Sequence, residues 1–332
     1  MSDTVTVLGA GSWGTALALL LTRAGTPVRL WDRSTDHLES LERDRENKRY
    51  LPGCVLPPSI DFVSDLHSAV KDVAGVVFAV PASGLPSLTP RVLACLSHGA
   101  NPIAIIVSKG IQPDRLLLPT AVMQDAGWVG SSVVLSGPNL ATEVARDVPA
   151  AAVAACEELG TASMVQKWFC SVRFRVYSST DRVGVEVGGA VKNVLALAAG
   201  SSDGLGFGDN TKAALLTRGL VEMARLGVAM GGRRDTFYGL TGVGDLLATA
   251  GSQLSRNWRV GYAVAQGTSV SDALISIGQV AEGVESSQAL RLLAQLHQVD
   301  MPVCEAIYSV YYQGVHPRDA VSRLMSRFAG IE

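Results

Sequence analysis

Short apolar runs alternate with helical stretches through the first half of the chain. The run Val5–Leu8 precedes a stretch with helical spacing at Ser12–Ala24, and Val28–Trp31 precedes the charged, helix-like stretch Ser34–Arg49. A Pro-rich loop over 51–58 follows. Strands separated by helices of this length form βαβ units, so the pattern predicts a mostly parallel sheet. Further strands are expected at Ile60–Val63, Val76–Val80, Ile103–Val107, Val133–Leu135, Ala151–Ala155 and Phe174–Tyr177.

The pattern of apolar residues along the chain changes near residue 183. Stretches rich in Ala, Leu, Val and Gly follow one another with helical spacing, and Gly, Ser and Asn loops separate them. The sequence therefore predicts an α/β fold, with a mostly parallel sheet domain over residues 1–185 and an all-α domain over 186–332. Helices of the second domain are expected at Val183–Ala199, Lys212–Met230, Leu246–Ala250, Trp258–Gln266, Val284–His297, Glu305–Gln313 and Pro317–Arg327.

Composition excludes several classes of protein. The chain carries 28 Lys+Arg and 30 Asp+Glu, a net charge of −2, which argues against a nucleic-acid-binding surface spread over the molecule. Hydrophobic residues make up 48% and charged residues 17%, so the chain can bury a large core. The most apolar stretches are shorter than the roughly 20 residues that a membrane span needs. The N-terminus lacks the basic region of a signal peptide. Five scattered cysteines without a C-x-x-C pattern fit free thiols in the cytoplasm.

A glycine-rich turn, Gly9–Gly14, follows the first predicted strand and opens a helix, which is the context that the G-x-G-x-x-G motif requires. In a dinucleotide-binding Rossmann fold, Gly9 permits the tight turn and Gly11 lets the backbone approach a pyrophosphate. Gly14 lets the helix pack on the strand. The first amides of the helix then hold the phosphates. The alternative is a structural turn without a ligand.

The second predicted strand ends in Asp32 and Arg33. An acidic residue at this place binds the adenine ribose hydroxyls and favours NAD, whereas an arginine pairs with the 2′-phosphate of NADP. Asp32 thus favours NAD, whereas Arg33 favours NADP. The sequence leaves the choice between NAD and NADP open.

Gly184, Gly188 and Lys192 stand four residues apart, so a helix would place them on one face. Glycines inside a helix cost about 1 kcal/mol each relative to alanine, so something approaches this face closely, either a cofactor ring or another helix. Apolar neighbours lower the pKa of a lysine and make Lys192 a candidate general acid and base. The alternative is a lysine that reaches solvent from a packed helix.

Other polar residues follow predicted elements. Lys109 comes after a strand, at the edge where α/β sheets bind ligands. Asp245 precedes a short helix, where it acts either as an N-cap or as an ion-pair partner of Lys192. Ser255–Asn257 opens another helix with a capping residue and an arginine, which suits a phosphate. The glycine-rich segment Gly200–Asn210 is expected to be a loop, either a mobile wall over the substrate or only a connection between helices. The five histidines are dispersed, so neither a metal site nor histidine catalysis is predicted.

Short motifs occur in one order along nearly the whole chain. They are Gly9–Ala16, Arg45–Asn47 with Tyr50–Pro52, Ser108–Gly110, Ser136–Pro138, Gly188–Asn193, Ser202–Gly208, Leu240–Asp245, Ser255–Asn257 and Gly278–Gly283. In this order they resemble the bacterial-type NAD(P)-dependent glycerol-3-phosphate dehydrogenases. These enzymes interconvert dihydroxyacetone phosphate and sn-glycerol 3-phosphate for glycerophospholipid synthesis. The resemblance implies a Rossmann domain, a helical C-terminal domain and a homodimer.

The resemblance also implies a set of site residues. The proton donor and acceptor that it implies is Lys192. The properties of the residues themselves add Lys109 and Asp245 as further candidate catalytic groups. The cofactor contacts that the resemblance implies are Ser12, Trp13, Arg33, Lys109, Ala141, Arg256, Val280 and Glu282. The turn itself adds Gly9, Gly11 and Gly14, and the end of the second strand adds Asp32. The substrate contacts implied are Lys109, Gly137, Asn139, Lys192, Asp245, Ser255, Arg256 and Asn257.

Asn139 and Ser108 depart from the family's usual residues, although both can still form hydrogen bonds. Two other functions share parts of this pattern. A β-hydroxyacid-type dehydrogenase also combines a Rossmann turn with a glycine-rich lysine helix, but it acts on carboxylates. A non-catalytic NAD(H) sensor would need the turn but not the combination of Lys192, Lys109 and Arg256.

Overall fold

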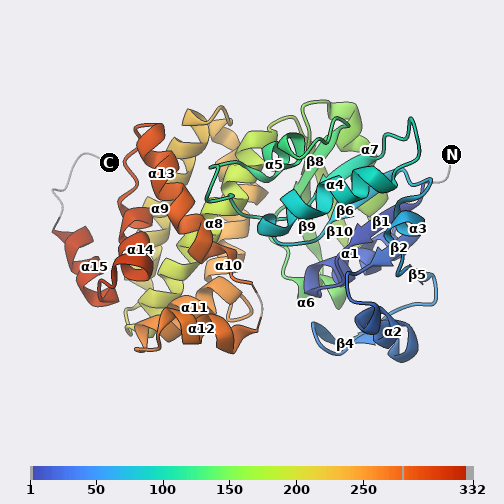
Figure 1. Cartoon of the computed structure of the whole chain (residues 1–332). Coiled ribbons are helices and arrows are strands. Elements are labelled where there is room, and N and C mark those ends of the chain that lie inside the picture. The colour runs from blue at the N-terminus through green and yellow to red at the C-terminus, as the bar shows by residue number, and fades with distance from the viewer. Residues whose placement is uncertain (1–2, 279, 327–332) are drawn as a thin grey trace. The chain divides into compact units, whose positions relative to one another are not determined.

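The computed structural model describes residues 3–278 and 280–326. Contacts divide the chain into two compact units: residues 1–108 with 117–185, and residues 109–116 with 186–332. The first unit is a sheet with helices on both faces, and the second is helical (Figure 1). The predicted α/β class, with a parallel-dominated sheet followed by an all-α part, is confirmed.

The first unit contains an eight-stranded sheet in the order β10-β9-β8-β7-β6-β1-β2-β5. Neighbouring strands are parallel except β8 and β9. Its elements are β1 (Val5–Leu8), α1 (Ser12–Arg23), β2 (Val28–Trp31), α2 (Thr35–Asp44), β3 (Glu46–Asn47), β4 (Leu51–Val55), β5 (Ile60–Phe62), α3 (Leu66–Val70), β6 (Gly75–Phe78), η1 (Ala82–Gly84), α4 (Leu85–Cys95), β7 (Ile103–Ile106), α5 (Pro119–Asp125), β8 (Ser132–Ser136), α6 (Ala141–Ala145), β9 (Ala150–Ala155), α7 (Leu159–Phe169) and β10 (Phe174–Ser179).

The sheet is buried on both faces, which explains why its strands are nearly continuous apolar runs. Val5 and Val7 of β1 pack into the core shared with α1 and α7, whereas Leu8 packs with α3, α4 and α5 on the opposite face. In register, Leu8 pairs with both Trp31 and Phe78. The residues that follow β1, β2 and β6 therefore meet at one edge of the sheet.

The second unit is built on the long helix α8 (Arg182–Gly204), whose first four residues belong to the first unit. This helix is long and apolar enough to cross a membrane, but 94% of its most apolar window is buried in the protein, as in a core helix. The other elements are α9 (Asp209–Ala229), η2 (Arg234–Tyr238), the π-helical turn η3 (Leu240–Gly244), α10 (Asp245–Ala250), α11 (Arg256–Ala265), α12 (Val270–Ile277), α13 (Glu282–Leu296), α14 (Pro302–Gln313) and α15 (Pro317–Met325).

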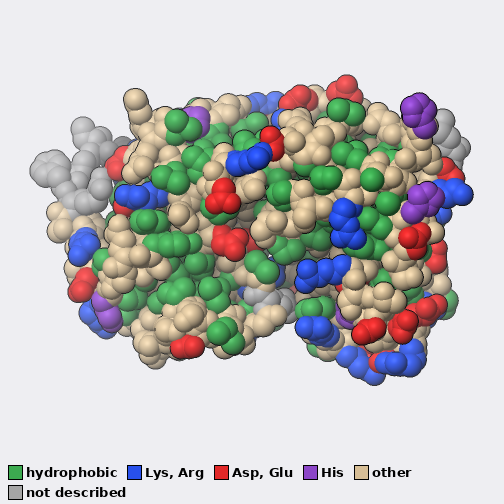
Figure 2. Space-filling view, in the orientation of Figure 1, with side chains coloured by type: hydrophobic (Ala, Val, Ile, Leu, Met, Phe, Trp, Pro, Cys, Tyr) green, Lys and Arg blue, Asp and Glu red, His purple; other side chains and the backbone are tan. Residues whose placement is uncertain are grey.

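The segment between β2 and β5 differs from the sequence prediction. The helix α2 ends at Asp44 rather than at Arg49, because Arg45 adopts a left-handed backbone conformation with φ of 49°. The predicted loop contains β4, which pairs with β3 as a two-stranded antiparallel sheet. Acidic and basic side chains gather over this part of the surface (Figure 2). Their alternation gave the segment the pattern of a solvated helix.

The predicted loop over Gly200–Asn210 is also largely wrong. The helix α8 continues to Gly204, so only Leu205–Gly208 connects it to α9. A Cβ on Gly200 would lie 2.0 Å from the carbonyl oxygen of Trp258. This glycine therefore permits close packing of α8 on α11 rather than a turn. The helix α12, which was not predicted, is capped by Ser269, whose side chain accepts from Asp272 N–H.

Candidate active site

The glycine-rich turn connects β1 to α1, and each glycine in its motif has a distinct structural setting. Gly9 has φ of +109°, and a Cβ there would lie 2.7 Å from the carbonyl oxygen of Ala79. A Cβ on Gly14 would lie 1.8 Å from the carbonyl oxygen of Gly9. A Cβ on Gly11 would meet nothing within 4 Å. The fold itself therefore requires Gly9 and Gly14, whereas Gly11 leaves open space where a pyrophosphate can approach the backbone.

The N-terminus of α1 fits an anion. Gly11 is its N-cap, no side chain caps it, and its first turn contains no acidic residue. Backbone amides at such an end, together with the helix dipole, stabilise phosphate oxygens. Ser12 donates from Oγ to the carbonyl oxygen of Tyr50 at 2.6 Å, and Trp13 is half-buried against the core. The residues present thus suit a dinucleotide.

Three side chains fix the turn at Ala10. The Ala10 N–H donates to Oδ2 of Asp32 at 2.8 Å. Its carbonyl oxygen accepts from Nδ2 of Asn47 at 2.9 Å and lies 3.1 Å from Nε2 of His37. His37 and Asn47 were not predicted from the sequence, because nothing local marks residues 27 and 37 positions away as partners of the turn.

A second group of predicted residues follows β8. Gly137 has φ of +146°, and a Cβ there would lie 2.9 Å from the carbonyl oxygen of Ala151. Asn139 donates to that same oxygen at 2.9 Å, while its own Oδ1 is buried without a hydrogen-bond partner among the described residues. Ala141 is the first residue of α6.

Lys192, Lys109 and Asp245 form a cluster within the second unit. Lys192 Nζ lies 2.9 Å from Oδ1 of Asp245, and Lys109 Nζ lies 2.7 Å from Oδ2. Lys192 also donates to Oγ1 of Thr249 at 2.6 Å, and Thr249 donates to Asp245 at 3.2 Å. Asp245 is 1% exposed and Lys192 is 6% exposed. One buried carboxylate therefore holds two ammonium groups.

Burial dominates the electrostatics of this cluster. It lowers the pKa of Lys192 to about 8; Asp245 opposes that shift, and the charge of Lys109 adds to it. The pKa of Asp245 lies below its ordinary value, because the two lysines outweigh the effect of its burial. A lysine with a pKa near 8 can both donate and accept a proton close to neutral pH.

The structure decides between the two roles considered for Asp245. The N-cap of α10 is Gly244, and Asp245 makes no capping hydrogen bond. The capping interpretation is therefore wrong, and the carboxylate is an ion-pair partner of Lys192. Thr249 was missed by the sequence analysis, although its position four residues after Asp245 on a helix was a usable signal.

A chain of amides connects this cluster to α11 and α13. Asn193 donates to the carbonyl oxygen of Lys109 at 2.7 Å. Asn257 donates to Oδ1 of Asn193 at 3.0 Å and accepts from Gly283 N–H at 3.0 Å. Asn257, which was predicted as a substrate contact, therefore uses two of its hydrogen-bonding positions to bind other residues of the protein.

The remaining predicted residues lie at the starts of α11 and α13. Ser255 caps α11 by accepting from Trp258 N–H at 3.2 Å, which confirms its predicted capping role. Arg256 is exposed at the first position of that helix, and Val280 is exposed just before α13. Glu282 begins α13, and its charge acts on both Lys192 and Arg256. Gln279, which belongs to the same sequence motif as Val280, lies outside the described residues.

Within residues 3–278 and 280–326, no group of three His, Cys, Asp or Glu side chains is arranged to hold a metal ion.

Comparisons with known proteins agree with one another. Residues 4–162 match the family described as the NAD-dependent glycerol-3-phosphate dehydrogenase N-terminus, and residues 181–322 match the corresponding C-terminus. A glycerol-3-phosphate dehydrogenase [NAD(P)+] from Geobacillus kaustophilus is 48% identical over 98% of this chain and 95% of its own length. The enzyme of the same name from Bacillus subtilis is 44% identical over 97% of this chain and 94% of its own length. The crystal structure of glycerol-3-phosphate dehydrogenase from Coxiella burnetii matches with a TM-score of 0.93 at 36% identity. The match covers 98% of this chain and 99% of the Coxiella chain.

Proposed function

The chain belongs to the NAD-dependent glycerol-3-phosphate dehydrogenase family, and we propose that it interconverts dihydroxyacetone phosphate and sn-glycerol 3-phosphate with NAD(H) or NADP(H). The observation that carries this proposal is the buried Lys192–Asp245–Lys109 cluster. Reduction of a ketone phosphate needs a proton donor at the carbonyl oxygen and positive charge beside it. The cluster provides both.

Lys192 holds the proton that the reaction moves. Since its pKa is about 8, the ammonium form predominates at pH 7. In reduction, Nζ donates its proton to the carbonyl oxygen as negative charge develops there, and in oxidation the neutral amine accepts the hydroxyl proton. The nicotinamide supplies or accepts the hydride when the cofactor is bound. Asp245 and Thr249 fix the direction of Nζ, and the charge of Lys109 stabilises the developing oxyanion.

Residues 1–185 would provide most of the dinucleotide contacts, and residues 186–332 would carry Lys192 and most of the proposed substrate contacts. The open space at Gly11 and the uncapped start of α1 support this assignment. The residues proposed to hold the cofactor are Gly9, Gly11, Ser12, Trp13, Gly14, Asp32, Arg33, Lys109, Ala141, Arg256, Val280 and Glu282.

The start of α11 is the proposed phosphate clamp. Arg256 presents a planar set of donors that matches phosphate oxygens, at a helix end whose amides also attract anions. Since an arginine binds carboxylates as well as phosphates, it is the family match that favours a phosphate substrate over a β-hydroxyacid. The residues proposed to contact substrate are Lys109, Gly137, Asn139, Lys192, Asp245, Ser255, Arg256 and Asn257.

We further propose that the enzyme works in the cytoplasm as a homodimer, supplying the backbone of glycerophospholipids. All five cysteines are free, which suits a reducing compartment. The homodimer rests on the family resemblance alone.

The experiment is oxidation of NADH and of NADPH by the purified protein with dihydroxyacetone phosphate, with free dihydroxyacetone as the control. We expect turnover with the phosphate ester only. Lys192→Ala should lose about 10²- to 10⁴-fold in rate while still binding the cofactor, because it lacks the proton donor. Lys167→Ala removes an exposed lysine of α7 and serves as the matched control. Nearly normal turnover by Lys192→Ala would overturn the assignment of Lys192. Cofactor binding without turnover in the unaltered protein would favour the NAD(H) sensor.

A further inference from the structure

The carboxylate of Asp32 lies at the end of β2 and is held by two backbone N–H groups. Oδ2 accepts from Ala10 at 2.8 Å, and Oδ1 accepts from Ser34 at 3.0 Å. An ionised carboxylate offers about four acceptor positions, so two remain for other donors. The hydrogen bond to Ala10 ties this negative charge directly to the glycine-rich turn.

The geometry points to a cofactor preference that the sequence left open. We propose that Asp32 makes this enzyme selective for NADH over NADPH, an inference that rests on the proposed function and deepens it. In this fold, the residue after the second strand meets the adenosine ribose. The free acceptor positions of Asp32 can receive the 2′- and 3′-hydroxyl protons of NADH. NADPH replaces the 2′-hydroxyl donor by a phosphate, which brings only acceptors and negative charge against a fixed carboxylate.

The residues that follow Asp32 offer little to a 2′-phosphate. The hydroxyl of Ser34 is engaged as the N-cap of α2, where it accepts from the backbone of His37. The His37 ring lies against the carbonyl oxygen of Ala10. Asp36 places a further negative charge in the first turn of α2. Arg33 is exposed and makes no hydrogen bond or ion pair with the described residues, so it is the one group of this segment that suits a 2′-phosphate.

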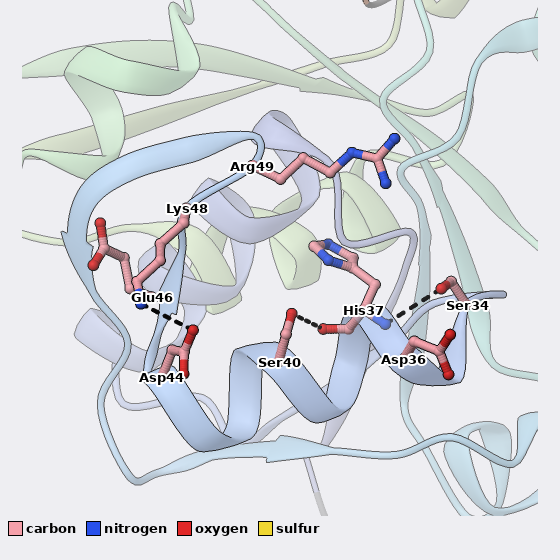
Figure 3. Close-up of a pocket in the computed structure, with 8 residues that line it drawn as sticks. All are labelled: Ser34, Asp36, His37, Ser40, Asp44, Glu46, Lys48 and Arg49. Carbon is pink, nitrogen blue, oxygen red and sulfur yellow. Dashed lines mark hydrogen bonds and ion pairs between the residues drawn. The ribbon is translucent and has the colours of Figure 1, made fainter.

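A pocket of about 430 Å³ begins beside this turn (Figure 3). Its walls carry the carboxylates of Asp36, Asp44 and Glu46 against the cations of Lys48 and Arg49. Lys48 is already paired with Asp44, with 3.0 Å between Nζ and Oδ2, and the Arg49 guanidinium lies over the Tyr50 ring at 4.9 Å from its centroid. Three carboxylates thus line this pocket against one arginine and one lysine that is already paired, which disfavours a 2′-phosphate there.

The test compares NADH with NADPH by kcat/KM and by direct titration of each dinucleotide, followed through its own fluorescence. We expect NADH to be favoured by at least about tenfold in both measurements. Asp32→Asn keeps the shape of the side chain and one acceptor while it removes the charge. This variant should reduce the preference at least about tenfold, mainly through tighter binding of NADPH. Arg33→Gln should weaken the binding of NADPH by a larger factor than the binding of NADH.

The matched control is His37→Ala, which removes another hydrogen bond to the same turn without changing the charge at Asp32. It should weaken both dinucleotides alike and leave their ratio unchanged. An unaltered protein that binds the two equally, or prefers NADPH, overturns the proposal. So does an Asp32→Asn variant that loses affinity for both by the same factor, because Asp32 would then only hold the turn. If Asp32→Asn does not fold, the unaltered protein and Arg33→Gln still decide. Selective NADH binding without turnover of dihydroxyacetone phosphate would refute the proposed function while supporting this inference.

Discussion

Asp245→Asn is the substitution that most directly probes the protonation state of Lys192. The carboxylate lies 2.9 Å from Lys192 Nζ and 2.7 Å from Lys109 Nζ, and asparagine keeps its shape without its charge. The two ammonium groups would then repel each other without a counter-charge. An opposite charge at this distance shifts a pKa by about 1–3 units, so we expect the pKa of Lys192 to fall from about 8 to about 6.

The direction of the reaction then determines the sign of the effect. At pH 7, a lysine with a pKa of 8 is about 90% protonated, and one with a pKa of 6 is about 10% protonated. Reduction, which needs the ammonium form, should therefore slow about ninefold at pH 7 and recover as the pH is lowered. Oxidation needs the neutral amine, so the fraction competent for it rises by the same factor. A lesion that merely distorted the site would slow both directions.

The assay is the pH dependence of kcat/KM between pH 5.5 and 9 in both directions, with thermal unfolding to show that the variant folds. Thr249→Val is the matched control, because it removes hydrogen bonds of Lys192 and Asp245 without removing charge. An unshifted profile for Asp245→Asn would refute the reasoning. Asp245→Asn breaks a buried ion pair, which costs about 3–5 kcal/mol of stability. If this variant does not fold, Lys109→Gln provides a second test, in which the pKa of Lys192 should shift in the opposite direction. It removes a positive charge that lowers the pKa of Lys192, and the profile should move above pH 8.

The other predictions concern the turn and the core of the second unit. Gly11→Ala should fold normally but raise the cofactor KM at least about tenfold, because its Cβ enters only the space meant for the pyrophosphate. Gly14→Ala should instead lose about 1–3 kcal/mol of stability, since its Cβ would lie 1.8 Å from the Gly9 carbonyl oxygen. If the two variants showed the same cofactor KM and the same melting temperature, this distinction between the two glycines would be wrong. Glu222 on α9 is 2% exposed and accepts from two backbone N–H groups at the start of α14. Burial raises the pKa of Glu222 to about 7, so the stability it contributes is complete below about pH 4.5 and is lost as the pH rises through 7. Glutamine does not titrate, so the melting temperature of Glu222→Gln should rise relative to that of the unaltered protein as the pH increases from 5 to 8. A difference in melting temperature that stays constant over this range would contradict the raised pKa of Glu222.

The strands were predictable because the sheet is covered on both faces. For that reason Ile103–Ile106 is an uninterrupted apolar run, and Val5–Leu8 is interrupted only by the buried Thr6. The β3–β4 pair escaped prediction because only Leu51 and Cys54 of β4 are buried, too few to produce a recognisable period. Gly200 was assigned to a loop because a sequence does not distinguish a glycine that permits a turn from one that permits close helix packing.

The site shows a similar division. Lys192, Lys109 and Asp245 could be proposed from residue type, position in a predicted element and family resemblance. The sequence could not decide between the two roles proposed for Asp245, because its partners lie 53 and 136 residues away and the local pattern favours a cap. His37 and Asn47 are comparable cases, since each contacts the glycine-rich turn only through the tertiary fold.

Close packing in the second unit explains why the proton-transfer lysine is buried beside its carboxylate. A Cβ on Gly188 would lie 2.5 Å from the carbonyl oxygen of Thr241, so only glycine lets the π-helical turn η3 approach α8 this closely. Asp245 follows η3 directly, and Lys192 follows Gly188 by one helical turn. The contact that excludes a side chain at Gly188 therefore also brings the carboxylate to Nζ. Burial lowers the pKa of Lys192 and the nearby carboxylate limits that fall, so the value near 8 depends on helix packing as well as on the charged groups.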